Sequence, residues 1–145
     1  MKGTVIYKEG VSFDAKTESG YSISIKGLSE NEGKNLSIRP MELMLLGLGG
    51  CMAIDVLLIL RKMRQEIISY TVNISGERAK TPPSVFMSVN MEHILKGNNI
   101  TATSIEKALN LAEQTYCSAS AMFAKTAKIS NTYLLVENKN EAFEK

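Results

Sequence analysis

The chain has 145 residues, of which 44% are hydrophobic and 22% are charged, an ordinary balance for a soluble globular protein. This length suits one domain that buries a core of its own without disulfide or metal staples. The 17 basic and 15 acidic residues are scattered and leave a net charge of +2. Without a basic run or a tryptophan, the composition excludes an obvious nucleic-acid surface.

The N-terminal sequence MKGTVIYKEG lacks the apolar core and the small-residue cleavage site of a secretory signal peptide. We therefore expect a cytoplasmic protein. Two cysteines, Cys51 and Cys117, lie far apart in the sequence. In a reducing compartment we expect them to be free thiols or a redox pair rather than a structural disulfide.

Residues 1–38 are predicted to form short strands followed by a loop. The segments TVIY, VSFDA and YSISI have β character, and YSISI alternates apolar and polar residues. The polar segment LSENEGKNLS is expected to be a loop that leads to Pro40, whose fixed φ suits the first turn of a helix.

A long cysteine-bearing helix is predicted over residues 39–67. The stretch from Leu43 to Ile54 carries no charge, and RKMRQE then gives a basic end that complements the helix dipole. Strands are predicted over residues 68–98, where YTVNISGER and VFMSVNMEHILK alternate on either side of the turn KTPPS. In the second strand one face is expected to hold Val85, Met87, Val89, Met91, His93 and Leu95.

Helices that include the second cysteine are predicted over residues 103–127, and a closing strand over residues 128–137. Thr103 and Glu106 have the spacing of a capping box, whereas TYCSASAMFAKTA indicates a second, more irregular helical piece. The tail KNEAFEK is expected to fray. This order of elements predicts a single α+β domain, residues 1–145, with an antiparallel sheet packed on helices.

The segment from Leu43 to Leu60 is apolar enough to raise the question of a membrane span. Asp55 would cost about 2.5–3.5 kcal/mol on insertion, and the surrounding strands need an aqueous globular setting. We therefore expect no membrane contact, because a helix that is apolar all round can equally be the centre of a fold or a dimer interface. Gly47 and Gly50 share one helix face, where they allow either close helix packing or space around the Cys51 sulfur.

The two thiols have a structural and a chemical interpretation. A free cysteine is often a small buried hydrophobe. However, Arg39 and Glu42 lie at the start of the helix that carries Cys51, and Cys117 lies in the small, polar break TYCSAS. A reactive thiol needs such partial access and a nearby positive charge.

Other site chemistries have weaker support. Zinc would need Cys51, Cys117, His93 and a carboxylate to converge without any CxxC or HxxxH pair, so no metal is predicted. His93, the chain's one histidine, lies on the apolar face of a strand, which favours a hydrogen-bonded core residue over a partner for a nucleophile. GLGG is not followed by Lys and Ser or Thr, so it is no phosphate loop, and no cofactor is predicted.

Two motifs carry a family resemblance. The segment RPMELMLLGLGGCMAIDVLLILRKMR, with a Pro-x-Glu-Leu helix start and LGGC on the same helix, is followed later by EQTYCSASAMF. Together they resemble the OsmC/Ohr family, especially its OsmC-like, YhfA-type branch, and the order of elements extends the resemblance to nearly the whole chain.

The resemblance implies an OsmC-like fold, which is an intertwined homodimer with antiparallel sheets wrapped around two central helices and active sites at the dimer interface. It implies a thiol-dependent hydroperoxide reductase of oxidative or osmotic stress defence, with Cys51 as peroxidatic and Cys117 as resolving cysteine. An organic hydroperoxide or another small hydrophobic molecule would be the substrate. A dithiol reductant would reopen the disulfide.

Hydroperoxide-reducing members of the family also use a glutamate and an arginine beside the first cysteine. Counted from the shared proline, their glutamate falls at Met41 here, and Glu42 follows one position later, about 100° further around the helix. Their arginine comes from an early segment where this chain offers Lys16, so Arg39 is expected to substitute. The predicted catalytic residues are Cys51, Cys117, Glu42 and Arg39. The alternative is a protein of this fold with little turnover that binds a small hydrophobic ligand at the dimer interface.

Overall fold

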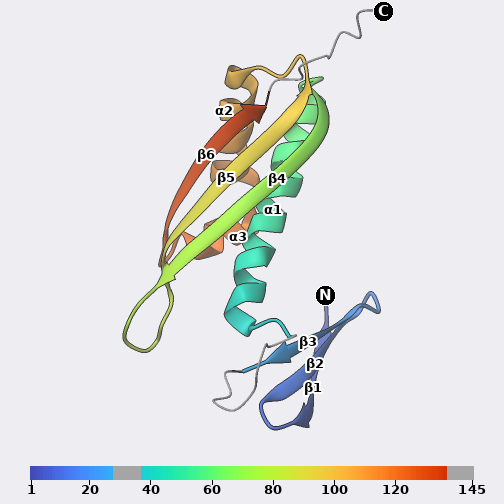
Figure 1. Ribbon diagram of the computed structural model, residues 1–145, viewed down its shortest axis with the longest axis vertical. Helices are drawn as coiled ribbons and strands as arrows, with labels where there is room; N and C mark the ends of the chain where they lie inside the picture. Colours follow the sequence, from blue (N-terminus) through green and yellow to red (C-terminus); the bar gives the residue numbers. More distant parts are fainter. Residues whose placement is uncertain (28–36, 137–145) are drawn as a thin grey trace, which may run out of the picture. The chain divides into compact units, whose positions relative to one another are not determined.

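The computed structural model describes residues 1–27 and 37–136. The chain folds as two compact units, Met1–Met44 and Leu45–Lys145. Most of the predicted loop LSENEGKNLS and all of the predicted frayed tail KNEAFEK lie outside the described residues. Figure 1 shows the elements of both units with the labels used below.

The N-terminal unit contains the strands that the sequence predicts. Strands β1 (Gly3–Glu9), β2 (Ser12–Thr17) and β3 (Ser22–Lys26) form an antiparallel sheet in chain order. The turns between them place Gly10 at φ 52° and Gly20 at φ 91°. Glycine adopts this left-handed backbone at no steric cost, which explains the tight reversals.

Helix α1 (Pro40–Lys62) begins at the proline, as predicted, but ends earlier than residue 67. Arg64 adopts φ 59°, and the Gln65 N–H donates to the Leu60 carbonyl at 3.0 Å, which closes the helix. Ile67 therefore belongs to the next strand, and its alternating neighbours pair as a ladder rather than continuing the helix.

The C-terminal unit holds a second sheet, in the order β4 (Glu66–Arg78), β5 (Phe86–Asn98) and β6 (Lys128–Val136). Strands β4 and β5 are antiparallel, as predicted. The predicted antiparallel pairing is wrong for β6, which pairs with β5 in parallel. Parallel neighbours need a long crossover, and the helices between β5 and β6 supply it (Figure 1).

The crossover consists of α2 (Ala102–Leu111), a short π-helix η1 (Ala112–Tyr116) and α3 (Ser118–Phe123). Helix α2 is capped by Thr101, whose hydroxyl accepts the Ser104 N–H at 3.2 Å, so the predicted cap at Thr103 is wrong. The predicted irregular piece is confirmed, because Cys117 interrupts the helices with an extended backbone, φ −73° and ψ 101°.

The core lies between α1, α2 and the inward face of this sheet. Its fully buried side chains include Leu48, Met52, Val56, Leu60, Val89, Met91, Leu95, Ile105 and Ala108. The predicted alternation on β5 holds from Val89 to Leu95 but not at Met87, which is 53% exposed while Phe86 is buried. The register with β4 shifts between Glu77 and Arg78, and this bulge exchanges the two faces.

Candidate functional site

The two cysteines that the sequence singles out lie beside each other in the C-terminal unit. Cys51 is half-buried on α1, and Cys117 is buried between η1 and α3; both are free thiols. Their sulfur atoms and a carboxylate oxygen of Asp55 all lie within 4.8 Å of one another. Segments distant in sequence therefore converge on a cluster of two thiols and one carboxylate.

Asp55 is the site residue that sequence reasoning missed. It follows Cys51 by four positions on α1, and residues at that spacing share a helix face. This spacing was the available signal, but from sequence alone Asp55 served only to disfavour membrane insertion.

The local fold fixes the position of the Cys117 sulfur. The π-turn closes where the Cys117 N–H donates to the Ala112 carbonyl at 2.8 Å. The sulfur in turn accepts the Ser120 N–H at 3.3 Å and caps α3. Short π-helical segments often occur at functional sites, and this one aims the buried thiol at α1.

The electrostatics of the cluster favour the neutral form of the Cys117 thiol. Burial, hydrogen bonding to Cys51 and the negative charges of Cys51 and Asp55 raise the pKa of Cys117 to about 12, against a smaller lowering by the Ser120 N–H. None of these groups is a cation. Cys117 therefore remains a thiol at neutral pH.

Arg39 and Glu42 pair with each other at the start of α1. The Arg39 backbone N–H donates to Glu42 Oε2 at 3.0 Å, and the Arg39 Nε lies 3.8 Å from Oε1. A glutamate at the third helical position that reaches back to the capping residue satisfies an otherwise unpaired N–H. Both residues belong to the N-terminal unit and both cysteines to the C-terminal unit, so their action on Cys51 stays a prediction.

His93 is a hydrogen-bonded core residue, as the sequence favours. Its Nδ1 lies 2.6 Å from the Tyr70 hydroxyl and its Nε2 lies 3.0 Å from Asn131 Oδ1, while Asn131 Nδ2 donates to Glu113 at 2.7 Å. The Asn131 oxygen can only accept, so Nε2 carries the proton and Nδ1 accepts from Tyr70. Burial lowers the pKa of His93. Both ring nitrogens are occupied, and neither is available to a thiol.

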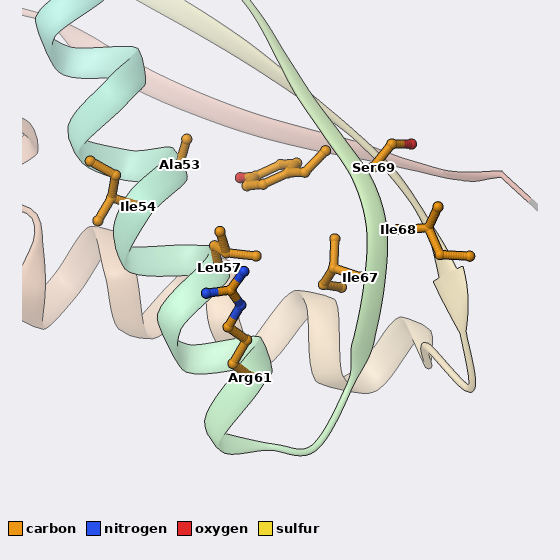
Figure 2. Close-up of a pocket in the computed structure, with 8 residues that line it drawn as sticks. Ala53, Ile54, Leu57, Arg61, Ile67, Ile68 and Ser69 are labelled. Carbon is orange, nitrogen blue, oxygen red and sulfur yellow. The ribbon is translucent and has the colours of Figure 1, made fainter.

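A pocket of about 350 Å³ lies between α1 and β4 (Figure 2). Its walls are mainly apolar, with the Arg61 guanidinium and the Tyr70 ring among them; the lining residues are Ala53, Ile54, Leu57, Arg61, Ile67, Ile68, Ser69 and Tyr70. A volume and lining of this kind suit a small, largely apolar ligand.

One side of α1 is left exposed by the residues that the structure describes in the C-terminal unit, 45–136. This uncovered face consists of Gly47, Gly50, Ile54 and Leu58; the two large side chains are 61% and 49% exposed, and a Cβ added at either glycine would meet nothing within 4 Å. By length and composition α1 could cross a membrane. Within its most apolar stretch of 18 residues, 33% is buried inside the protein. A buried dimer helix meets the same criteria.

The comparisons with known proteins decide the family. The family model for OsmC-like proteins matches residues 33–131. Protein YhfA of Escherichia coli K12 is 32% identical over 136 residues, which cover 94% of this chain and 98% of YhfA. The chain belongs to the OsmC-like family.

This OsmC-like protein also shares its fold with solved structures. An OsmC-like protein from Mycoplasma pneumoniae superposes with a TM-score of 0.79 at 19% identity, covering 93% of this chain and 96% of that one. The organic hydroperoxide resistance protein OhrB of Bacillus subtilis gives a TM-score of 0.63 at 14% identity, covering 92% and 96%. The α+β fold predicted from the resemblance is confirmed, whereas the intertwined dimer stays a prediction.

Proposed function

We propose that this OsmC-like protein is a thiol-dependent hydroperoxide reductase that serves in oxidative or osmotic stress defence. The observation that carries the proposal is the convergence of Cys51 and Cys117 with their sulfurs within 4.8 Å. OhrB of Bacillus subtilis, an organic hydroperoxide resistance protein, adds support by analogy of fold.

The difference in burial between the thiols favours distinct roles. Cys51 is half-buried, whereas Cys117 is 3% exposed and its pKa is raised to about 12. The Cys51 thiolate would attack the O–O bond, release the alcohol once its oxygen takes a proton, and become a sulfenic acid. The Cys117 thiol would then condense with it to a disulfide and release water, and a dithiol reductant would restore both thiols while becoming a disulfide itself.

The chemistry of the cluster supports this order of events. Burial, followed by hydrogen bonding to Cys51, raises the pKa of Cys117. A buried thiol with a raised pKa is a poor first nucleophile, which favours Cys117 as the second cysteine to react. A disulfide needs a sulfur separation of about 2.05 Å, so the two sulfurs have at most about 3 Å to close.

The test exposes the reduced, chelator-treated protein to cumene hydroperoxide and follows peroxide consumption and protein mass. Wild type should lose the mass of two hydrogen atoms per chain as the disulfide forms, and Cys117→Ser should stop at a sulfenic acid that dimedone traps. Cys51→Ser should be inactive. If Cys51→Ser and wild type consume peroxide equally slowly, the proposal fails.

The expected partner is a second copy of the chain, in the cytoplasm and without membrane or nucleic acid. The uncovered face of α1 exposes Ile54 and Leu58, and the N-terminal sheet exposes Val5, Tyr7 and Tyr21. Burying such apolar surface is the main driving force for association. Recovery of the whole chain in the soluble fraction would eliminate the alternative of a membrane anchor.

A second candidate function is ligand binding with little turnover. The pocket beside Arg61 and Tyr70 favours it, because apolar walls with one cation suit a small apolar molecule with an anionic group. Native mass spectrometry of the purified protein should then show a co-purified ligand that the variant Leu57→Trp loses. Peroxide would leave the thiols of such a protein unoxidised.

A further inference from the structure

We propose that Cys51, Asp55 and Cys117 together bind one Zn²⁺ ion, with a fourth coordination position left open. The proposal stands apart from peroxide reduction, because it rests on the positions of three ligand atoms and not on turnover. His93 takes no part in this site, because its ring nitrogens are hydrogen-bonded to Tyr70 and Asn131.

The geometry of the cluster is close to that of a zinc site. The three ligand atoms lie within 4.8 Å of one another. Around a tetrahedral Zn²⁺, with Zn–S near 2.3 Å and Zn–O near 2.0–2.2 Å, they would be about 3.5–3.8 Å apart. Binding would require the ligand atoms to approach one another by roughly 1 Å.

The surrounding fold fixes the positions of the three ligand residues. Cys51 and Asp55 lie four residues apart on α1, so one helix face presents both. The Cys117 sulfur accepts the Ser120 N–H at 3.3 Å, a contact of the kind that orients and stabilises a metal-bound thiolate. Cys51 is only half-buried, which gives an ion a path to the cluster.

The charges of the cluster also favour a cation. The Asp55 carboxylate lies beside both sulfurs, with its ligand oxygen and the two sulfur atoms within 4.8 Å of one another. No ion pair to Asp55 occurs among the residues that the structure describes, 1–27 and 37–136. A divalent ion would replace both thiol protons and offset three neighbouring negative charges.

The donor set selects the metal. Two thiolates disfavour Mg²⁺ and Ca²⁺, which take oxygen ligands, and the carboxylate makes the site less suited to Cu(I) than an all-sulfur site. Zn²⁺ accepts sulfur and oxygen ligands together, and three protein ligands with an open position is its arrangement in catalytic sites. A bound ion would also shield both sulfurs from oxidants.

The test titrates the reduced full-length protein with Zn²⁺ in competition with a chromophoric chelator, and with Co²⁺ as a spectroscopic probe. We expect one ion per chain and a thiolate-to-cobalt charge-transfer band. Asp55→Asn should weaken Zn²⁺ binding by at least about 10- to 100-fold, while Cys51→Ser and Cys117→Ser should each reduce the charge-transfer band. Asp14→Asn, at the chain's other aspartate, is the matched control and should bind as wild type does.

Two results would overturn the site: no stoichiometric binding by a wild type whose thiols titrate as free, or equal affinity of wild type and Asp55→Asn. Circular dichroism of each variant checks its fold. A readout without peroxide, the rate of Cys51 alkylation, should fall when Zn²⁺ is added and recover with chelator. Peroxide consumption is measured in chelator, so failure of the zinc site leaves the reductase test intact, and the reverse also holds.

Discussion

At the residue scale, the carboxylate beside the thiols is Asp55, whereas Glu42 is engaged at the start of α1. Glu42 accepts the Arg39 N–H, and Asp55 has an oxygen within 4.8 Å of both sulfurs. A carboxylate that close disfavours a thiolate, so it opposes rather than assists the usual activation of a cysteine. Burial and the neighbouring groups of the cluster therefore favour a protonated Cys117 thiol.

The raised pKa of Cys117 predicts slow alkylation and a loss of stability in alkali. With a pKa of about 12, only about one part in 10⁴ of this thiol is ionised at pH 8. Iodoacetamide should therefore modify native Cys117 at least about tenfold more slowly than Cys51, as peptide mass spectrometry would show.

The same shift sets the direction of the alkaline effect. The native pKa lies above the ordinary value of 9.0, so the stabilisation is full below about pH 9 and is lost as the pH rises towards 12. Urea unfolding between pH 8 and 10.5 should show a steeper loss for wild type than for Cys117→Ser, which retains a side-chain cap. Equal slopes would contradict the assignment.

His93 should contribute stability that is lost in acid. Its pKa is lowered from 6.5, chiefly by burial, so its contribution is full above about pH 6.5 and declines as the pH falls below that value. His93→Ala leaves Tyr70 and Asn131 without their partner and should cost about 2–4 kcal/mol of unfolding free energy at pH 7. His93→Gln should cost less and give a flatter slope between pH 6.5 and 5 in urea titrations.

At the element scale, local signals located the elements but not their ends or pairing. Pro40 marked the start of α1. The helix ends where Arg64 adopts a left-handed backbone, and an arginine in the sequence does not predict that conformation. The alternation on β5 was predictable from the sequence. The bulge that buries Phe86 and exposes Met87 depends on the pairing with β4. The parallel pairing of β6 depends on the path of the crossover, which periodicity does not encode.

Close packing between elements predicts that Gly76 tolerates no side chain. A Cβ there would lie 2.8 Å from two ring atoms of Phe86 and 3.2 Å from Leu45. Gly76→Ala should therefore lower the unfolding free energy by about 1–3 kcal/mol in urea denaturation. Gly49→Ala is the matched control, because its Cβ would make only an ordinary 3.4 Å contact with Ile74. A Gly76→Ala variant as stable as this control would contradict the packing.

At the scale of the whole molecule, motifs predicted more than periodicity did. The cysteine motifs led to the family, and the family implied the fold that the solved structures confirm. The resemblance also implied that Cys51 and Cys117 lie close together. The position of Asp55 beside both thiols was visible only in the three-dimensional structure, where α1 packs against the crossover. The four-residue spacing of Cys51 and Asp55 indicates a shared helix face, but sequence spacing cannot place Cys117 beside them.

The uncovered face of α1 predicts self-association. Ile54 is 61% exposed at its centre, so Ile54→Glu should shift the protein from dimer to monomer in light scattering coupled to size-exclusion chromatography. Met87→Glu, at a residue 53% exposed on β5, should leave the dimer intact. A wild type that is monomeric at micromolar concentration would refute the homodimer.

The placement of the two cysteines has a consequence for the entropy of the chain. A Cys51–Cys117 disulfide would link α1 to the crossover and close a loop of roughly 66 residues. The lost chain entropy would raise the free energy of the unfolded state by about 4 kcal/mol. The oxidised form would thus be harder to unfold and harder for proteases to cut than the reduced form. Each cycle of oxidation and reduction would alternately raise and lower the free energy of unfolding. The stability of the protein would therefore depend on whether it had recently reacted with an oxidant.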